Sequence, residues 1–315
     1  MFYRPLFRFV PDGTKIRFMN GRFAGLIVSA ILSTASILLF FYPGLNMGLD
    51  FKGGVVLEVH TAQPANFGEL RAALAAAGLK DAALQSFGND GQGVLISLES
   101  RSTASQTQTA ISEAETALNS AAPNAKILST QAVGASVSQE LFAQGLEALG
   151  LSFLMILIYI WFRFEWQFAV GAVATLILDT TKTIGFMVLT RIPFDLVTIA
   201  AILTVIGYST NDKVVVYDRV RENLRKYKTM PLRDLIDLSI NETLNRTLGT
   251  SGTVFLAALP LALFGGSALA GFAWIMLFGI VVGTSSSIFI AAPILLFLGE
   301  HRLRRSATLP KAHGS

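Results

Sequence analysis

The sequence of 315 residues contains no cysteine and only three histidines, His60, His301 and His313. Without cysteine the chain can form neither a disulfide framework nor a thiolate-ligated metal site. The histidines are scattered along the sequence, which argues against a histidine-rich metal site. We therefore expect no bound metal.

Nucleotide-binding and catalytic patterns are also missing: there is no P-loop, no dinucleotide fingerprint and no Ser-His-Asp arrangement. We therefore expect no cofactor and no enzymatic activity. If the chain uses energy, the source is expected to be an ion gradient rather than ATP.

Charge is scarce as well. Asp, Glu, Lys and Arg make up 15% of the residues and apolar residues 52%, whereas charged residues are about a quarter of a soluble domain. This composition predicts a membrane protein with one modest soluble part. The net charge of +4 is small, and its distribution marks topology rather than nucleic-acid binding.

Six apolar segments are long enough to cross a hydrocarbon core of about 30 Å. The first follows a basic amino-terminal segment, residues 1–22. It is too long for the apolar region of a signal peptide, so we expect an uncleaved anchor. The chain is thus predicted to be an α-helical polytopic membrane protein, with spans at residues 23–42, 141–162, 167–189, 196–217, 246–264 and 271–298, the last five within a 139–298 helical region.

Basic residues mark one side of the membrane. They gather in residues 1–22, at the 163–166 turn, in a hydrophilic loop at 218–245 and in the tail, residues 299–315. The positive-inside rule places all four in the cytoplasm. An even number of spans agrees, because it returns both termini to the same side.

Residues 43–138 are predicted to form a small soluble domain on the opposite side. Eight acidic residues outnumber five basic ones there, and long apolar runs are absent. The pattern predicts strand, helix, strand, strand, helix, strand, with a turn at 88–91. That order is typical of an α+β ferredoxin-like fold. The predicted elements are strands 55–59, 83–87, 94–98 and 125–131 and helices 66–77 and 104–120.

Two aspartates fall inside predicted spans, where a carboxylate costs from about 2.5 to more than 10 kcal/mol. Asp212 lies in a polar stretch, residues 209–213, and either carries a proton or is paired structurally. Its neighbour Lys213 projects about 100° away round the helix, so the two cannot pair on one face. Asp179 and Lys182 lie one turn apart, which fits either a neutralised packing pair or a proton path beside a cation.

Arg246 belongs to a polar stripe at helical spacing, with Thr243, Thr250 and Thr253. One interpretation is an arginine whose head group reaches the interface. The other is an intramembrane counter-charge for Asp212, because neighbouring spans could place the two at one depth.

Several motifs together resemble the SecD/SecF family. Gly48–Gly54, with sequence GLDFKGG, resembles the family's G-x-D-F-x-G-G signature, and Ile206–Lys213 with Val216–Asn223 resembles its fourth span. Asn245-Arg246-Thr247, Phe264-Gly265-Gly266 and Gly283–Ser287 resemble later parts of the family. The SecD branch carries a much larger external region, for which about 95 residues leave no room. The resemblance is therefore to the SecF branch.

The resemblance implies a bacterial inner-membrane protein of the resistance-nodulation-division superfamily with a periplasmic domain. SecD would supply a second set of six spans, giving a twelve-helix bundle. SecYEG, SecA and unfolded secretory proteins would be further partners, with YajC as another candidate. The implied activity is use of the proton-motive force to promote late translocation and release of secreted proteins.

By the same resemblance, Asp212, Arg246 and Asp179 are the candidates for proton coupling, and Asp50, Gly53 and Gly54 shape the junction between span and domain. Two departures are visible: Leu178 stands where the family usually has histidine, and Lys182 and Lys213 stand where it has uncharged residues. Two alternatives stay open, namely a half-transporter for small molecules and a structural stabiliser of SecD without proton coupling of its own.

Overall fold

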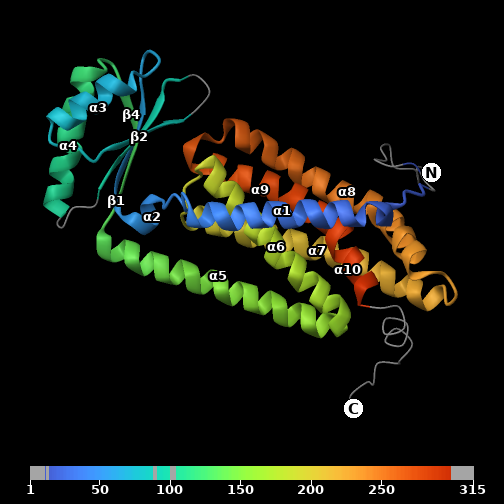
Figure 1. Ribbon diagram of the computed structural model, residues 1–315. Coiled ribbons are helices and arrows are strands. Elements are labelled where there is room, and N and C mark those ends of the chain that lie inside the picture. Colours follow the sequence, from blue (N-terminus) through green and yellow to red (C-terminus); the bar gives the residue numbers. More distant parts are fainter. Residues whose placement is uncertain (1–10, 12–13, 88–90, 100–103, 299–315) are drawn as a thin grey trace, which may run out of the picture.

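The computed structural model describes residues 11, 14–87, 91–99 and 104–298 (Figure 1). Positions 88–90 of the predicted turn, most of residues 1–13 and the predicted tail at 299–315 lie outside the described residues. The described part consists of a bundle of long helices and a small sheet domain at one end of it.

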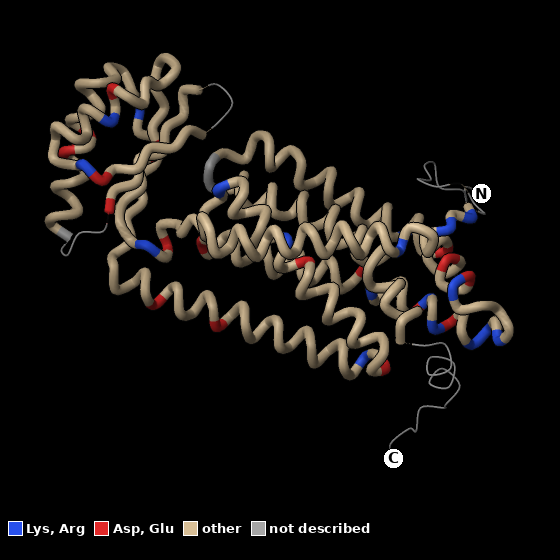
Figure 2. The backbone as a smooth tube through the Cα atoms, viewed as in Figure 1, with Lys and Arg blue, Asp and Glu red and all other residues tan. Residues whose placement is uncertain are grey.

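Six helical segments are long and apolar enough to cross a membrane, which confirms the predicted fold class. They are η1 (Phe18–Gly21) with α1 (Arg22–Phe41), α5 (Ala135–Arg163), α6 (Trp166–Thr190), α7 (Leu196–Lys226), α8 (Leu232–Phe264), and the continuous series α9 (Gly266–Ser286), η2 (Ser287–Ala291) and α10 (Ala292–Phe297). Figure 2 shows charged residues gathered at the ends of the bundle and sparse along its middle.

The centre of the bundle is formed by α6, α7 and α9. In these three spans 50–56% of the apolar stretch is buried, against 17% or less in the other three. Small residues allow the close approach: a Cβ added to Gly283 of α9 would lie 3.1 Å from the Cβ of Ser209 on α7. Side chains where α6, α7 and α9 face one another are therefore shielded from lipid and water by this chain itself.

The segment predicted as a hydrophilic loop, residues 218–245, is helical except at 227–231. α7 runs on to Lys226 and α8 begins at Leu232. The reason is an apolar stripe within the polar sequence, formed by buried Leu224, Leu235 and Ile240. Apart from Asp237, which is buried and accepts a hydrogen bond from the Met19 backbone, the charged residues lie outside this stripe, so their number alone suggested a loop.

The sheet domain has the predicted element order: β1 (Gly54–His60), α3 (Phe67–Ala76), β2 (Ala83–Phe87), β3 (Gly93–Leu98), α4 (Ala104–Ala121) and β4 (Lys126–Val133). The strands lie in the order β2-β3-β1-β4, and every neighbouring pair is antiparallel. Both helices cover one face (Figure 1). Alternate strand residues such as Leu57 and Ile96 form the core with Leu74 and Leu118. The ferredoxin-like prediction is confirmed.

The glycine pair forms the junction between helix and sheet. A short helix, α2 (Leu49–Lys52), ends at Gly53, and Gly54 begins β1. Their φ angles are +71° and +119°, which residues with a Cβ rarely adopt. The irregularity of β1 lies elsewhere, between Glu58 and Val59, so the pair is a turn rather than a bulge.

Candidate functional site

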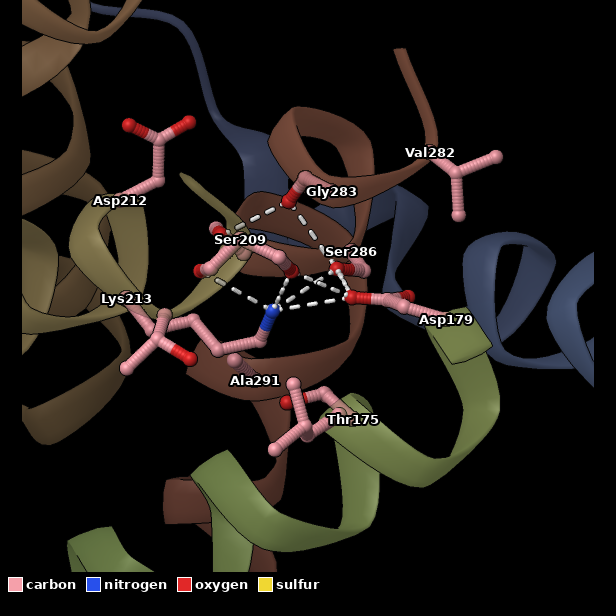
Figure 3. A network of polar contacts seen from close by, with 12 residues as sticks. Thr175, Asp179, Ser209, Asp212, Lys213, Val282, Gly283, Ser286 and Ala291 are labelled. Atoms are coloured by element: carbon pink, nitrogen blue, oxygen red, sulfur yellow. Dashed lines mark hydrogen bonds and ion pairs between the residues drawn. The ribbon is translucent and has the colours of Figure 1, made fainter. Parts of the chain in front are cut away.

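Asp179 of α6 is bound by side chains from two other helices. Its Oδ2 accepts hydrogen bonds from Lys213 Nζ at 2.9 Å, Ser209 Oγ at 2.8 Å and Ser286 Oγ at 2.6 Å (Figure 3). Ser209 and Lys213 belong to α7 and Ser286 to α9. The carboxylate therefore joins the three central helices at one point.

The ammonium of Lys213 lies among oxygens. Besides Asp179 it donates to the Ser209 carbonyl oxygen at 3.2 Å, to Ser286 Oγ at 3.3 Å and to Ser209 Oγ. The side chains of Lys213 and Asp179 are only 1% and 2% exposed. A buried charge is tolerated when it is paired and hydrogen-bonded, and both conditions hold here.

A second lysine approaches the other oxygen of the same carboxylate. Lys182 Nζ lies 3.6 Å from Asp179 Oδ1 and is 5% exposed. Asp179 Oδ1 has no hydrogen-bond partner, so this contact is an ion pair without a hydrogen bond. The expected Asp179–Lys182 pair is present, but Asp179 makes its hydrogen bonds with α7 and α9.

Asp212 lies on α7 three residues after Ser209, and its carboxylate points away from the Asp179 cluster (Figure 3). It is 6% exposed. Its Oδ2 accepts from Ser251 Oγ of α8 and Thr284 Oγ1 of α9, both at 3.3 Å, and these two hydroxyls lie 2.8 Å apart. No ion pair joins Asp212 to a cation of the described chain.

Arg246 does not face Asp212. It is exposed, and no ion pair joins these two described residues. Ser251, which does reach Asp212, lies five residues further along α8, about 140° round the helix and roughly 7.5 Å along it. The structure therefore does not contain the expected ion pair between these two described residues, and a role of Arg246 in proton coupling stays a prediction.

One stretch of α9 serves both carboxylates. Thr284 bonds Asp212 and Ser286 bonds Asp179. The helix then continues directly into a π-helical turn, η2, whose last carbonyl oxygen, that of Ala291, accepts a hydrogen bond from the buried Tyr217 hydroxyl of α7 at 3.0 Å. Such turns occur frequently at functional sites.

Asp50 and Asp195 both bind the amino-terminal end of α7. Asp195 Oδ1 accepts from the Thr198 backbone at 2.8 Å in a capping box. Asp50 Oδ2, from the glycine-pair motif, accepts from the Leu196 backbone at 3.0 Å. Burial raises the pKa of the Asp195 carboxyl above its ordinary value, and the hydrogen bonds from Thr198 oppose that change.

The junction segment is also bonded to the 190–195 turn along its backbone. Gly48 N donates to Phe194 O at 2.8 Å and Phe194 N to Asn46 O at 2.7 Å. A Cβ added to Gly48 would lie 2.9 Å from the Asp195 Cβ. The junction of span and domain is thus attached directly to the helix that carries Asp212.

Asp218 and Arg219 belong to a separate charge network near the end of the bundle. Arg163 pairs with Asp218 at 2.5 Å, and Arg219 pairs with Glu242 at 2.7 Å. These pairs link α5 and α8 to the carboxy-terminal part of α7. Among the described residues, no group of three or more His, Cys, Asp or Glu side chains could hold a metal ion.

Sequence reasoning found Asp179 and Asp212 but missed their hydrogen-bonding partners. Ser209, Ser251, Thr284 and Ser286 are common residues in membrane helices, and only the tertiary contacts distinguish them. The resemblance of Gly283–Ser287 to a family motif was the single available signal for the α9 hydroxyls.

The family described as "Protein export membrane protein SecD/SecF, C-terminal" matches residues 113–301, and "SecD/SecF GG Motif" matches residues 38–65. A protein translocase subunit SecF of Rhodobacter capsulatus is 40% identical over 307 residues, covering 94% of this chain and 92% of that protein. The Cereibacter sphaeroides protein of the same name is 42% identical over 298 residues, covering 93% and 92%.

The crystal structure of SecDF, a translocon-associated membrane protein from Thermus thermophilus, superimposes with a TM-score of 0.82 at 30% sequence identity. The match covers 91% of this chain and 39% of that one, so the chain corresponds to about two fifths of the solved protein. With six apolar helices and relatives matched over nearly their whole length, it is a multi-pass protein of the inner membrane. The chain belongs to the SecD/SecF family of protein-export membrane proteins.

Proposed function

We propose that this chain is a subunit of the bacterial Sec export machinery that, together with SecD, uses the proton-motive force to promote late translocation and release of secreted proteins. In this proposal Asp212 is the group that takes up and gives up the proton. The relatives' name, protein translocase subunit SecF, supports the export role. The chain's part is transport driven by an ion gradient, without enzymatic chemistry.

The observation that carries the proposal is that buried Asp212 accepts hydrogen bonds from two hydroxyls and forms no ion pair within the described chain. A hydroxyl can both donate and accept a hydrogen bond, so Ser251 and Thr284 can bind the carboxyl group with or without its proton. No cation of the described chain would lose its partner on protonation. Asp179 differs, because its protonation would leave two buried ammonium groups without a counter-charge.

Protonation at Asp212 can alter helix packing because three helices meet there. Its hydrogen bonds connect α7 to α8 and α9. A proton changes the relative free energy of any two arrangements that bind the two forms differently. Since α7 is bonded at its other end to Asp50 and the glycine-pair junction, movement of α7 would reach the external domain.

Exposed polar residues in the spans support a membrane partner. Asn211 of α7 and Arg246, Thr250 and Thr253 of α8 are exposed in this chain. Polar groups facing lipid are costly, so a second membrane protein is expected to cover them. We propose SecD as that partner, and SecYEG, SecA, unfolded secretory proteins and YajC as members of the wider assembly.

For orientation we propose that the end of the bundle carrying Arg163 and Arg219 lies in the cytoplasm, and that both termini are cytoplasmic as the basic flanks of the sequence predict. The sheet domain then lies in the periplasm. A reporter enzyme that works only in the periplasm should be active when it is fused within the sheet domain. Activity of a reporter that works only in the cytoplasm, fused at the same position, would overturn this orientation.

The test is gradient-dependent export in membrane vesicles that contain the Asp212→Asn variant with SecD. Asparagine keeps the shape and hydrogen-bonding capacity of the side chain but cannot carry the proton. We expect export to fall to the level that wild-type vesicles show after the gradient is collapsed. The matched control is Asp218→Asn, also on α7 but paired with Arg163, which should keep its response to the gradient.

The alternatives give other results. Export by Asp212→Asn vesicles that still responds fully to the gradient would reject coupling at Asp212. If the Asp212→Asn variant supports normal export and SecD is lost only when the whole chain is deleted, the chain is better described as a structural stabiliser of SecD. Gradient-driven uptake of small molecules without any effect on export would favour a half-transporter.

A further inference from the structure

The group around Lys213 Nζ has the composition of a cation-binding site. Its oxygens are the carboxylate of Asp179, the hydroxyl and carbonyl of Ser209 and the hydroxyl of Ser286. They come from α6, α7 and α9, and each of the side chains is 2% exposed or less. We call these three residues the oxygen cage (Figure 3).

Oxygen cages of this kind suit monovalent cations. Backbone carbonyls replace the hydration shell of alkali cations in membrane proteins. An ammonium group carries the same single charge and makes directional bonds to the same oxygens. In this chain the charge is attached to α7 by the lysine side chain.

We propose that Asp179, Ser209 and Ser286 form a monovalent-cation site whose permanent occupant is the ammonium group of Lys213, which excludes free alkali cations. The inference concerns ion specificity and adds to the proposed function, because of the two buried aspartates in the predicted spans, Asp179 and Asp212, it leaves Asp212 alone open to exchange with an ion.

The local charge balance explains the exclusion. Asp179 already has Lys213 at 2.9 Å and Lys182 at 3.6 Å. A free cation would be a third positive charge beside one carboxylate, in a medium where like charges repel strongly. Shortening Lys213 to alanine removes one positive charge and opens space beside Asp179 Oδ2 for a cation with its remaining water.

The experiment measures the thermal unfolding midpoint of the full chain in detergent with sodium chloride, potassium chloride or choline chloride at equal concentration. Choline is too large for the cage. For Lys213→Ala we expect at least one alkali cation to raise the midpoint by roughly 5 °C over choline, the size expected when a ligand binds only the folded state. Wild-type protein should show no difference among the three salts.

Two further variants make the result decisive. Lys182→Met with Lys213→Ala removes the remaining lysine, which could otherwise move to Asp179 Oδ2, and should show a larger alkali effect than the single variant. Asp179→Asn with Lys213→Ala removes the anionic oxygen and should show none.

Several outcomes would overturn the proposal. These are an equal response in wild type, no response in either variant that keeps Asp179, or no folded protein from those variants in any of the salts. Because the readout is unfolding rather than export, failure here is distinguishable from failure of proton coupling at Asp212.

Discussion

Asp179 and Asp212 lie in the same helix bundle at similar burial, 2% and 6% exposed, yet their surroundings differ. Asp179 is held by two lysines and two hydroxyls. Asp212 is held by two hydroxyls alone. Burial therefore does not decide what a membrane carboxylate can do. The presence of a fixed counter-charge does, because it determines whether loss of the negative charge leaves another charge unpaired.

The largest expected effect separates the two sites by stability. Asp179→Ala leaves two lysines buried beside no anion and should lower the free energy of unfolding by about 3–5 kcal/mol. Asp212→Ala should cost about 1 kcal/mol, a typical value for a point mutation, because Ser251 and Thr284 still bond each other. Denaturant unfolding in detergent measures both, and equal losses would abolish the distinction.

A smaller effect compares the two α9 hydroxyls. Ser286→Ala removes a 2.6 Å hydrogen bond to Asp179 and should cost about 1.5–3 kcal/mol, as for bonds to charged groups. Thr284→Val removes a 3.3 Å bond to Asp212 and should cost about 1 kcal/mol or less. Ser285→Ala is the control, since this exposed hydroxyl bonds only the Val282 carbonyl. A reversed order would contradict the assignment of charge at Asp179.

Asp195 extends the comparison to a carboxylate outside the membrane. Its pKa is raised in the folded state, so its contribution to stability is present below the ordinary carboxyl pKa and is lost as pH rises through the folded-state pKa. Asp195→Asn keeps the cap, because asparagine caps as well as aspartate. The stability of wild type relative to this variant should therefore fall with rising pH.

The fall in the stability of wild type relative to Asp195→Asn should be smaller than the total contribution of a helix cap to the free energy of unfolding, about 1 kcal/mol. Unfolding midpoints of both proteins measured across the acidic range test it. A wild-type advantage that grows with pH would show that the hydrogen bonds from Thr198 outweigh burial.

The smallest expected effect concerns Arg246. It is exposed in this chain, so Arg246→Met should change the free energy of unfolding of the chain by no more than about 0.5 kcal/mol. Gradient-dependent export together with SecD should nevertheless decline, because the proposed partner covers this face. If the variant exports as well as wild type, Arg246 is only an interfacial anchor. A large loss of stability in the isolated chain would show instead that Arg246 has a partner within this chain.

Local patterns were sufficient for much of the fold. Hydropathy located the six spans, and alternation with turn residues located the βαββαβ domain. Segment 218–245 was misjudged because its charges hid an apolar stripe that only packing against the bundle reveals.

The site was less accessible from sequence. Lys182 looked like the partner of Asp179 because it is one turn away, but Lys213, 34 residues further along the chain, makes the hydrogen bond. Arg246 looked like the partner of Asp212 because charge was the only visible cue. The rotation of α8 instead presents Ser251, and rotation about a helix axis is set by tertiary packing rather than by sequence spacing.

The π-helical turn after Ser286 has a consequence for how α9 could move. A π-helical turn contains one residue more than an α-helical turn. Such a turn can shift along a helix by exchanging one backbone hydrogen bond at a time, without breaking all the others. Tyr217 pins one end of it at Ala291, and the hydroxyls that bind the two carboxylates lie just before the other end. The π-helical turn is thus adjacent to the hydroxyls of Thr284 and Ser286, so α9 can change its hydrogen-bond register next to the two buried carboxylates.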